Sequence, residues 1–286
     1  MKEVVVLSGK GGTGKTTIVA SFAALGNSKA MVDCDVDAAD LYLLLKPEVR
    51  EAREFWSGQK AVIDKKFCTR CGICEVVCRF EAIKNFKVDP ISCEGCGFCY
   101  QVCLENTITM EKNLSGQWFI SETRYGPLVH ARLGIAQENS GRLVTVVRHN
   151  ARIIAEKEGL EYILSDAPPG IGCPVISSLS GVDLALLVTE PTLSGVHDLE
   201  RVLGVCRHFG VPALVCINKH DLDEENTSRI EGICQEQGMG VVSKIPFDNV
   251  VTEALVNGVP VVEYSENPVA QQIKRLWQTV SSVLGQ

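Results

Sequence analysis

The sequence predicts an α/β protein built on a doubly wound, mostly parallel sheet, with a small ferredoxin-like α+β domain inserted into it. Three observations support this prediction. Short apolar runs alternate with longer helical patterns, a glycine-rich turn follows the first run, and eight cysteines are crowded between Cys68 and Cys103. Alternation of this kind is typical of crossover units around a parallel sheet.

The elements of the larger domain follow from these patterns in chain order. Strands are predicted at residues 2–7, 30–33, 162–166, 183–189, 213–218 and 240–245, and helices at 16–25, 151–159, 193–209, 227–237 and 269–284. The last helix carries apolar residues at helical spacing, so we expect it to pack on the sheet and not to anchor the chain to a membrane. Ligands of such sheets bind beyond the carboxyl ends of the strands, so the loops beginning at Gly9, Asp33, Asp166 and Asn218 should converge on one site.

Composition limits the classes of function. The chain has 286 residues and a formal charge of −7, with 28 basic and 35 acidic side chains. A net negative protein has no overall positive field to attract nucleic acid or anionic lipid. No leader pattern precedes the first strand, and no apolar run approaches the roughly 20 residues of a spanning helix. We therefore expect a cytoplasmic protein, with neither nucleic-acid binding nor membrane insertion.

The glycine-rich turn matches a phosphate-binding loop. Gly9-x4-Gly14-Lys15-Thr16 follows a predicted strand and opens a predicted helix, which is the context that this motif requires. Backbone N–H groups would face phosphate oxygens, Lys15 would hold the β- and γ-phosphates, and the Thr16 hydroxyl would ligate Mg²⁺. A turn without a ligand fits this spacing and context less well. The predicted phosphate-binding residues are Gly9, Gly11, Gly12, Thr13, Gly14, Lys15, Thr16 and Thr17.

The same loop contains a second lysine, Lys10, which most phosphate-binding loops lack. The stretch GKGGTGKT, residues 9–16, resembles the deviant Walker A motif of the MinD/ParA/Mrp P-loop ATPases. The resemblance implies a Mg²⁺-dependent ATPase, slow and stimulated by a partner, that closes into a homodimer on binding ATP. It also implies that Lys10 reaches the phosphates bound by the other subunit, where a cation stabilises the transferring group only on closure. The alternative is a solvated loop lysine.

Other positions that resemble this family carry further expected roles. Asp33 and Asp35 end a strand as the family's switch I does, with Asp35 orienting the attacking water and Asp33 supporting the Mg²⁺ shell. YILSDAPPG resembles the Walker B and switch II region, so Asp166 would bind Mg²⁺ through water and the Gly170 N–H would sense the γ-phosphate. The predicted Mg²⁺ site is thus Thr16, Asp35 and Asp166, and the predicted catalytic residues are Lys10, Lys15, Asp35 and Asp166.

The base of the nucleotide is assigned by the same resemblance. Asn218 follows a strand, where relatives use an amide to recognise the adenine edge. Pro246 and Phe247 lie in a segment that resembles the relatives' base-contacting loop. The resemblance extends over the whole chain outside the cysteine-rich segment.

The cysteine-rich segment contains one spacing twice. Each run reads C-x2-C-x2-C-x3-C, which resembles the two-cluster bacterial ferredoxin module, in which the fourth cysteine of each run ligates the other cluster. The predicted ligands are Cys68, Cys71, Cys74 and Cys103 for one 4Fe-4S cluster, and Cys93, Cys96, Cys99 and Cys78 for the second. Arg79 and Leu104 replace the proline that often follows the fourth cysteine. Zinc is the main alternative, since disulfides fit a reducing cytosol poorly.

Together these patterns predict an ATPase domain at 1–58 and 113–286, interrupted by a ferredoxin-like domain at 59–112. The first functional hypothesis is that ATP-dependent dimerisation gates electron transfer through the clusters to a partner. The alternative is an ATPase for assembly or delivery of iron-sulfur or other metal clusters, so the expected partner is a redox or metallocluster client. Spatial positioning of the MinD/ParA kind comes third, because the acidic charge and the lack of a basic tail count against it. For Cys173, outside the runs, we expect a structural role; the alternative is a ligand near the dimer axis, since relatives of nitrogenase-reductase character bridge a cluster between subunits from nearby loops, although with a different spacing.

Overall fold

The computed structural model describes residues 1–26, 28–135 and 137–285, and the chain divides into two compact units. The larger unit comprises Met1–Ala52, Trp118–Arg132 and Ser140–Gln286, and the smaller unit comprises Arg53–Gln117 and Leu133–Asn139. All eight clustered cysteines fall in the smaller unit. The domain limits 1–58, 59–112 and 113–286 stay a prediction.

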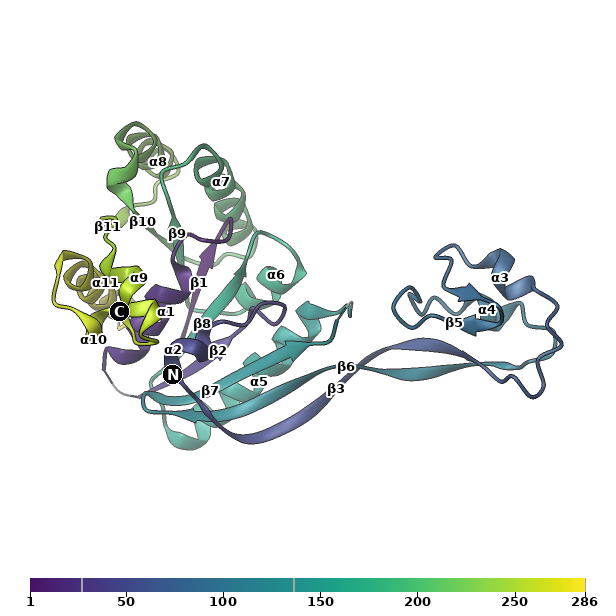
Figure 1. Ribbon diagram of the computed structural model, residues 1–286. Helices are drawn as coiled ribbons and strands as arrows, with labels where there is room; N and C mark the ends of the chain where they lie inside the picture. Colours follow the sequence, from purple (N-terminus) through teal and green to yellow (C-terminus); the bar gives the residue numbers. More distant parts are fainter. Residues whose placement is uncertain (27, 136, 286) are drawn as a thin grey trace. The chain divides into compact units, whose positions relative to one another are not determined.

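A nine-stranded sheet contains most of the strands, in the order β11-β10-β9-β1-β8-β2-β7-β6-β3 (Figure 1). The strands are β1 Lys2–Ser8, β2 Lys29–Asp33, β3 Glu48–Ile63, β4 Ile83–Lys84, β5 Lys87–Val88, β6 Ile108–Thr123, β7 Gly126–Leu133, β8 Tyr162–Pro169, β9 Leu184–Thr189, β10 Ala213–Asn218 and β11 Val241–Ile245. The helices are α1 Lys15–Ala24, α2 Leu41–Leu45, α3 Ile73–Val77, α4 Phe98–Gln101, α5 Ser140–Glu158, α6 Cys173–Leu179, α7 Leu193–His208, α8 Glu224–Glu236, α9 Val250–Val256, α10 Val261–Tyr264 and α11 Pro268–Leu284, with a short 3-10 turn at His220–Leu222. Strand β1 pairs in parallel with β8 and β9, and β2 pairs in parallel with β7 and β8.

The predicted parallel α/β sheet is therefore confirmed, and each predicted strand and helix of the larger unit is present. The main difference is α5, which begins at Ser140 and not at residue 151. Its first turns bury Leu143, Val144 and Val147, whose apolar spacing also fits a helix and extends it beyond the predicted start. Strand β3 was missed because most of its residues are exposed and polar, so it lacks an apolar pattern.

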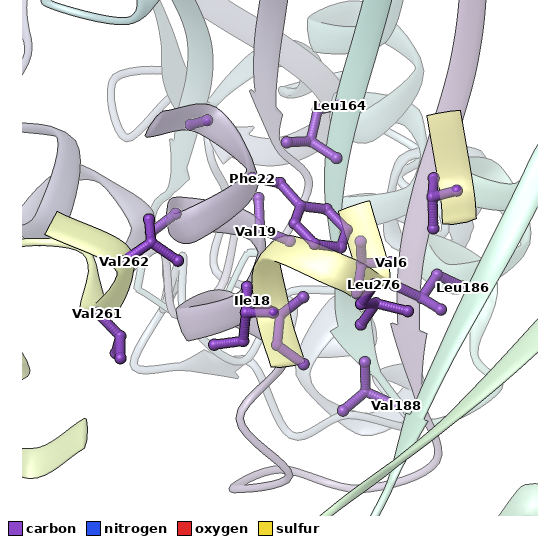
Figure 2. Packing of buried hydrophobic residues seen from close by; sticks show 14 of the residues in the cluster. Val6, Ile18, Val19, Phe22, Leu164, Leu186, Val188, Val261, Val262 and Leu276 are labelled. Carbon is purple, nitrogen blue, oxygen red and sulfur yellow. The ribbon is translucent and has the colours of Figure 1, made fainter. Parts of the chain in front are cut away.

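Both faces of the central strands are buried, as expected for a parallel sheet covered by helices. Alternate residues of β1 enter two different cores: Val4 and Val6 pack with helices α1 and α11, whereas Val5 and Leu7 pack with α6 and α7. Figure 2 shows the first core, where Phe22 of α1 and Leu276 of α11 lie against the sheet. The apolar runs of these strands thus follow from burial on two sides.

The terminal helix and the scattered cysteines occupy the positions expected for core residues. In α11, Val269, Ile273, Leu276, Val280 and Leu284 are buried, and Trp277 is half-buried against the same core, which confirms a packed helix. The cysteines outside the doubled run, apart from the exposed Cys173, are all buried: Cys34, Cys206, Cys216 and Cys234. Among the described residues, no helix combines the length and the apolarity needed to cross a bilayer.

An almost fully buried ion-pair network connects β1 to the helices beside it. Glu3 is 4% exposed and Arg148 of α5 is 5% exposed. The Arg148 Nε donates to Glu3 Oε1 over 2.8 Å, and Arg152 Nε donates to Glu3 Oε2 over 2.9 Å. The Arg148 guanidinium also donates to the Ser177 and Ser180 carbonyls of the α6 segment. The Arg148 guanidinium therefore joins β1, α5 and the α6 segment.

Replacing Arg148 by methionine should destabilise the protein strongly. Glu3 would remain buried with only the half-exposed Arg152 as a partner, and breaking a buried pair by removing one member costs about 3 kcal/mol or more. Urea denaturation measures this free energy of unfolding. Arg229→Met, on the exposed side of α8, is the matched control and should change it by less than about 0.5 kcal/mol. A loss no larger than the control's would contradict a structural role for the network.

Candidate functional site

The strand ends bring the predicted catalytic groups together. Strand β2 ends at Asp33, which is in register with Asp166 of the neighbouring β8, while β1 on the other side of β8 leads into the glycine-rich loop. Helix α1 begins at Lys15, and the residue before it, Gly14, has no side chain with which to cap the first N–H groups. Unsatisfied N–H groups and the positive end of the helix dipole together favour an anion at this point.

An ion pair between Lys15 and Asp166 lies at the centre of the site. Lys15 Nζ lies 3.0 Å from Asp166 Oδ1, and the two side chains are 8% and 2% exposed. Burial lowers the pKa of Lys15, but the charge of Asp166, with those of Asp35 and Asp33, outweighs this and raises it. Lys15 is therefore a cation among three carboxylates, ready to exchange one of them for phosphate.

Asp33 and Asp35 have different surroundings. Asp33 is buried, and its oxygens accept hydrogen bonds from the backbone N–H groups of Asp35 and Leu41. Burial and the neighbouring Asp166 raise the pKa of Asp33 well above its usual range. Asp35 is half-buried and keeps one carboxylate oxygen without a partner in the described contacts, the other accepting from Ala38. Asp33 is therefore held by backbone hydrogen bonds of the following loop, whereas the carboxylate of Asp35 is freer to bind another group.

The glycine-rich loop is packed closely against neighbouring segments. Gly14 has a φ of 89°, and a Cβ there would lie 2.3 Å from the Asn218 Nδ2. That amide nitrogen donates to the Thr13 carbonyl over 2.7 Å, while the Asn218 Oδ1 accepts from the Lys219 N–H. Thr13 Oγ1 is buried and finds no hydrogen-bond partner among the described residues. A buried hydroxyl without a partner is unfavourable, and a bound phosphate would provide the partner.

An open cleft of about 580 Å³ extends from this loop. Its lining includes Gly11, Gly12, Thr13, Gly14, Lys15, Thr16 and Thr17, together with Asp35, Asp40, Leu43, Leu44, Pro169 and Leu255. The predicted phosphate residues thus share one cleft with Asp35, except for Gly9, which lies against Asp198 and does not line the cleft. Gly170 is placed differently, because its N–H donates to the Ser8 carbonyl over 2.9 Å. Contact of that N–H with a γ-phosphate would require this hydrogen bond to break.

Lys10 is not part of the cleft lining. Its Nζ lies 2.7 Å from Glu190 Oε1 and donates to the hydroxyls of Thr192 and Ser194 over 2.8 and 3.0 Å. Glu190 also pairs with Lys219, at 2.8 Å. Glu190 and Lys219 were missed from the sequence. One signal was present, since Glu190 follows the last residue of β9 just as Asp33 ends β2.

The segment predicted to contact the base lies next to the Asn218 loop. Asp221 accepts a hydrogen bond from the Phe247 N–H over 2.7 Å, and the Phe247 ring is 49% exposed. Pro246, before it, is half-buried. The side chain of Asn218 is hydrogen-bonded to the Thr13 carbonyl and to the Lys219 N–H, so it supports the phosphate-binding loop.

In the smaller unit, the eight cysteines line two separate hollows. One hollow is lined by Cys68, Cys71, Cys74 and Cys103, and the other by Cys78, Cys93, Cys96 and Cys99. Apolar groups such as Ile63, Ile83 and Ile108 pack around them. All 13 cysteines lie among the described residues, and none forms a disulfide.

The two runs also share a local structure. Helix α3 begins after Gly72 and carries Cys74, and α4 begins after Gly97 and carries Cys99. Both glycines have positive φ, 82° and 74°, a conformation that side-chain-bearing residues rarely adopt. The doubled spacing thus folds as a doubled turn and helix, and each helix turns a cysteine inward.

In the described part of the chain, no three His, Cys, Asp or Glu side chains are grouped to hold a single metal ion. A cubane differs from a single ion, because each of its four irons takes its own thiolate and the four sulfurs stand further apart. Mg²⁺ in nucleotide sites takes one or two carboxylates and completes its shell with phosphates and water. The donor sets therefore fit both groups chemically.

Comparison with known proteins identifies the family. The model of the CobQ/CobB/MinD/ParA nucleotide binding domain matches residues 4–261. The chain belongs to this family. Membership confirms the predicted enzyme class, so the chain is an ATPase. Its structural neighbours include the cell division ATPase MinD of Pyrococcus furiosus and a ParA family ATPase of Chlorobium tepidum.

Individual relatives and structural neighbours match nearly the whole of this chain. The uncharacterized protein MJ0578 of Methanocaldococcus jannaschii is 33% identical over 286 residues, covering 99% of this chain and 97% of that protein. The putative septum site-determining protein MinD of Oltmannsiellopsis viridis is 27% identical, covering 91% of this chain and 69% of that protein. The MinD structure from Pyrococcus horikoshii with Mg-ADP has a TM-score of 0.60 at 21% identity, covering 99% and 97% of the two chains, which shows the shared fold.

These relatives correct the predicted function. The named relatives and structural neighbours are MinD and ParA proteins of cell division and partition. Gated electron transfer, and its alternative of cluster assembly or delivery, were therefore wrong, and spatial positioning, which was placed third, is favoured. The error has a physical reason: a cysteine motif indicates what one segment can bind, not what an ATP-driven cycle does. The net charge of −7 is likewise a sum over the whole chain and excludes no local binding surface.

Replacing Asn218 by alanine should weaken phosphate binding itself. The change leaves the Thr13 carbonyl without its partner, and losing one such hydrogen bond costs about 1 kcal/mol, roughly a fivefold loss of affinity. Calorimetric titration with Mg-ADP and with Mg-tripolyphosphate, which has no base, should show the same factor. Exposed Asn257→Ala is the control. A loss confined to Mg-ADP would instead support the role of Asn218 as an adenine contact.

Proposed function

We propose that this protein is a positioning ATPase of the MinD/ParA type, in which ATP and Mg²⁺ close two copies of the chain into a homodimer and hydrolysis reopens it. The observation that carries the proposal is the unequal placement of the two loop lysines. Lys15 lines the cleft and pairs with Asp166, whereas Lys10 lies outside the cleft lining. A lysine outside its own phosphate site is available to a neighbouring one.

The residues of the cleft fit the first steps of such a cycle. Phosphate oxygens would replace Asp166 as the partner of Lys15 and satisfy the Thr13 hydroxyl. Asp166 would then be free to support Mg²⁺ through water, with Thr16 and Asp35 beside it. Asp35 would orient the attacking water, and Gly170 would exchange the Ser8 carbonyl for the γ-phosphate. Asn218, Pro246 and Phe247 would border the base.

We propose further that the smaller unit is a ferredoxin-like insertion that holds two 4Fe-4S clusters. Support comes from the agreement between the two predicted ligand sets and the two hollows, each lined by four cysteines. Bound clusters would supply one-electron chemistry and cross-link the two cysteine runs. A redox or metallocluster client for this unit, and a cytoplasmic location, stay predictions.

Lys15→Ala should lower the ATPase rate by at least about a hundredfold, since it removes a charge that stabilises the transferring phosphoryl group. A phosphate-release assay measures this rate.

Lys10→Ala should abolish ATP-dependent dimerisation and leave nucleotide binding to the monomer unchanged, because Lys10 lies outside the cleft lining. Sedimentation velocity with a non-hydrolysed ATP analogue measures the dimer. A normal ATP-dependent dimer in Lys10→Ala would contradict the proposed cycle.

Protein purified without oxygen should contain about eight iron and eight acid-labile sulfide ions per chain if both clusters are bound. Cys96→Ser should remove about half of the iron, because it removes a ligand from one hollow only. Cys173→Ser, at an exposed cysteine outside both hollows, is the matched control and should remove none. Stoichiometric zinc without sulfide would overturn the cluster assignment.

A further inference from the structure

Lys10 is held by its own subunit through every hydrogen that its ammonium group can donate. The three acceptors are Glu190 Oε1 at 2.7 Å, Thr192 Oγ1 at 2.8 Å and Ser194 Oγ at 3.0 Å. An ammonium has three donors, so none is left for another partner. All three acceptors come from the end of β9 and the start of α7. Lys10 can therefore reach a different anion only by giving up this set.

Glu190 divides its carboxylate between two lysines. Its Oε2 lies 2.8 Å from Lys219 Nζ, which also donates to the Gly12 carbonyl over 2.9 Å. The Glu190 side chain is 13% exposed. Burial raises the pKa of this carboxyl, but its hydrogen bonds and charge pairing with Lys10 and Lys219 outweigh that and lower it. Glu190 is thus an anion shared by two cations beside the phosphate loop.

This sharing makes the release of Lys10 less costly than breaking an isolated buried pair. When Lys10 leaves, Glu190 keeps Lys219, so no buried carboxylate is left unpaired. Lys219 also keeps its hold on Gly12, so the loop retains its shape. The Lys10 backbone is fixed as well, because its carbonyl accepts from the Ser8 hydroxyl over 2.8 Å. The side chain of Lys10 is the part that can move.

We propose that Glu190 is a positioning residue that keeps Lys10 in its own subunit until the phosphates of a second copy of this chain draw it away. The inference rests on the proposed function, since it needs Lys10 to act across a dimer. A contact made only in the separated chain opposes dimerisation by its own free energy. Glu190 thereby sets the protein concentration at which the ATP-bound chain dimerises.

Glu190→Gln tests this with little change of shape. The amide keeps an acceptor for Lys10 but loses the charge, so the concentration for half-maximal dimerisation should fall by about tenfold, the order of one charge-assisted hydrogen bond. Sedimentation with Mg²⁺ and a non-hydrolysed ATP analogue gives that concentration. Glu200→Gln, the same change at an exposed position of α7, should have no effect. Unchanged or weaker dimerisation of Glu190→Gln overturns the inference.

A double-mutant comparison separates Lys10 from Lys219. In a chain that already carries Lys219→Ala, Glu190→Gln should still lower the concentration for half-maximal dimerisation by about the same factor, because the contact with Lys10 is still there to lose. No effect of Glu190→Gln in that background would mean that Glu190 acts through Lys219 and the loop, and would also overturn the inference.

Lysine labelling tests the contact without any dimer. In nucleotide-free protein, the acylation rate of Lys10 relative to exposed Lys157, measured by mass spectrometry, should rise several-fold in Glu190→Gln, because Lys10 loses a strong partner. An unchanged labelling rate of Lys10 overturns this inference and leaves the proposed function standing. Faster labelling of Lys10, together with no ATP-dependent dimer in the unchanged chain, overturns the proposed function and this inference with it.

Discussion

The pairing of two buried aspartates at neighbouring strand ends is the constraint on which the nucleotide site depends. The parallel register of β2 and β8 places Asp33 beside Asp166, and both are almost fully buried. Two adjacent buried carboxylates are unfavourable unless a cation or hydrogen bonds compensate them. Lys15 and the N–H groups of Asp35 and Leu41 supply that compensation. The loop that carries Lys15 is thereby tied to the sheet even before a nucleotide binds.

Much of this arrangement could be predicted from the sequence because parallel strands have one ligand-binding edge. Asp33, Asp166 and Asn218 each stand at the end of a short apolar run, so their convergence follows from the alternation of elements alone. The two hollows each contain four cysteines, in the same sets that the resemblance to two-cluster ferredoxins implies, and their role as cluster ligands stays a prediction. Local patterns are informative when the geometry they imply is short-range.

The features of the site that the sequence did not predict depend on contacts between distant segments. Glu190 and Lys219 belong to no loop motif, and only the fold brings them to Lys10, across separations of 180 residues or more in the chain. The Asn218 amide supports the Thr13 carbonyl, a role that no pattern around it suggested. Strand β3 escaped notice because its stability comes from pairing within the sheet and not from an apolar face of its own. The function was predicted wrongly because a cysteine motif indicates what one segment binds, whereas the role of an ATPase depends on the surfaces that its cycle exposes.

Thiol exposure divides the cysteines into two chemical classes. Burial raises the pKa of Cys34 and Cys216 to about 12 and that of Cys206 and Cys234 to about 11, so these thiols stay protonated and unreactive. Cys71, Cys96 and Cys173 are exposed. A maleimide dye would therefore modify Cys173 at the start of α6, and Cys71 and Cys96 only in protein without bound clusters, while the interior of the ATPase is spared. Cys173 is thus a ready attachment point for a fluorescent label on the cluster-bound protein.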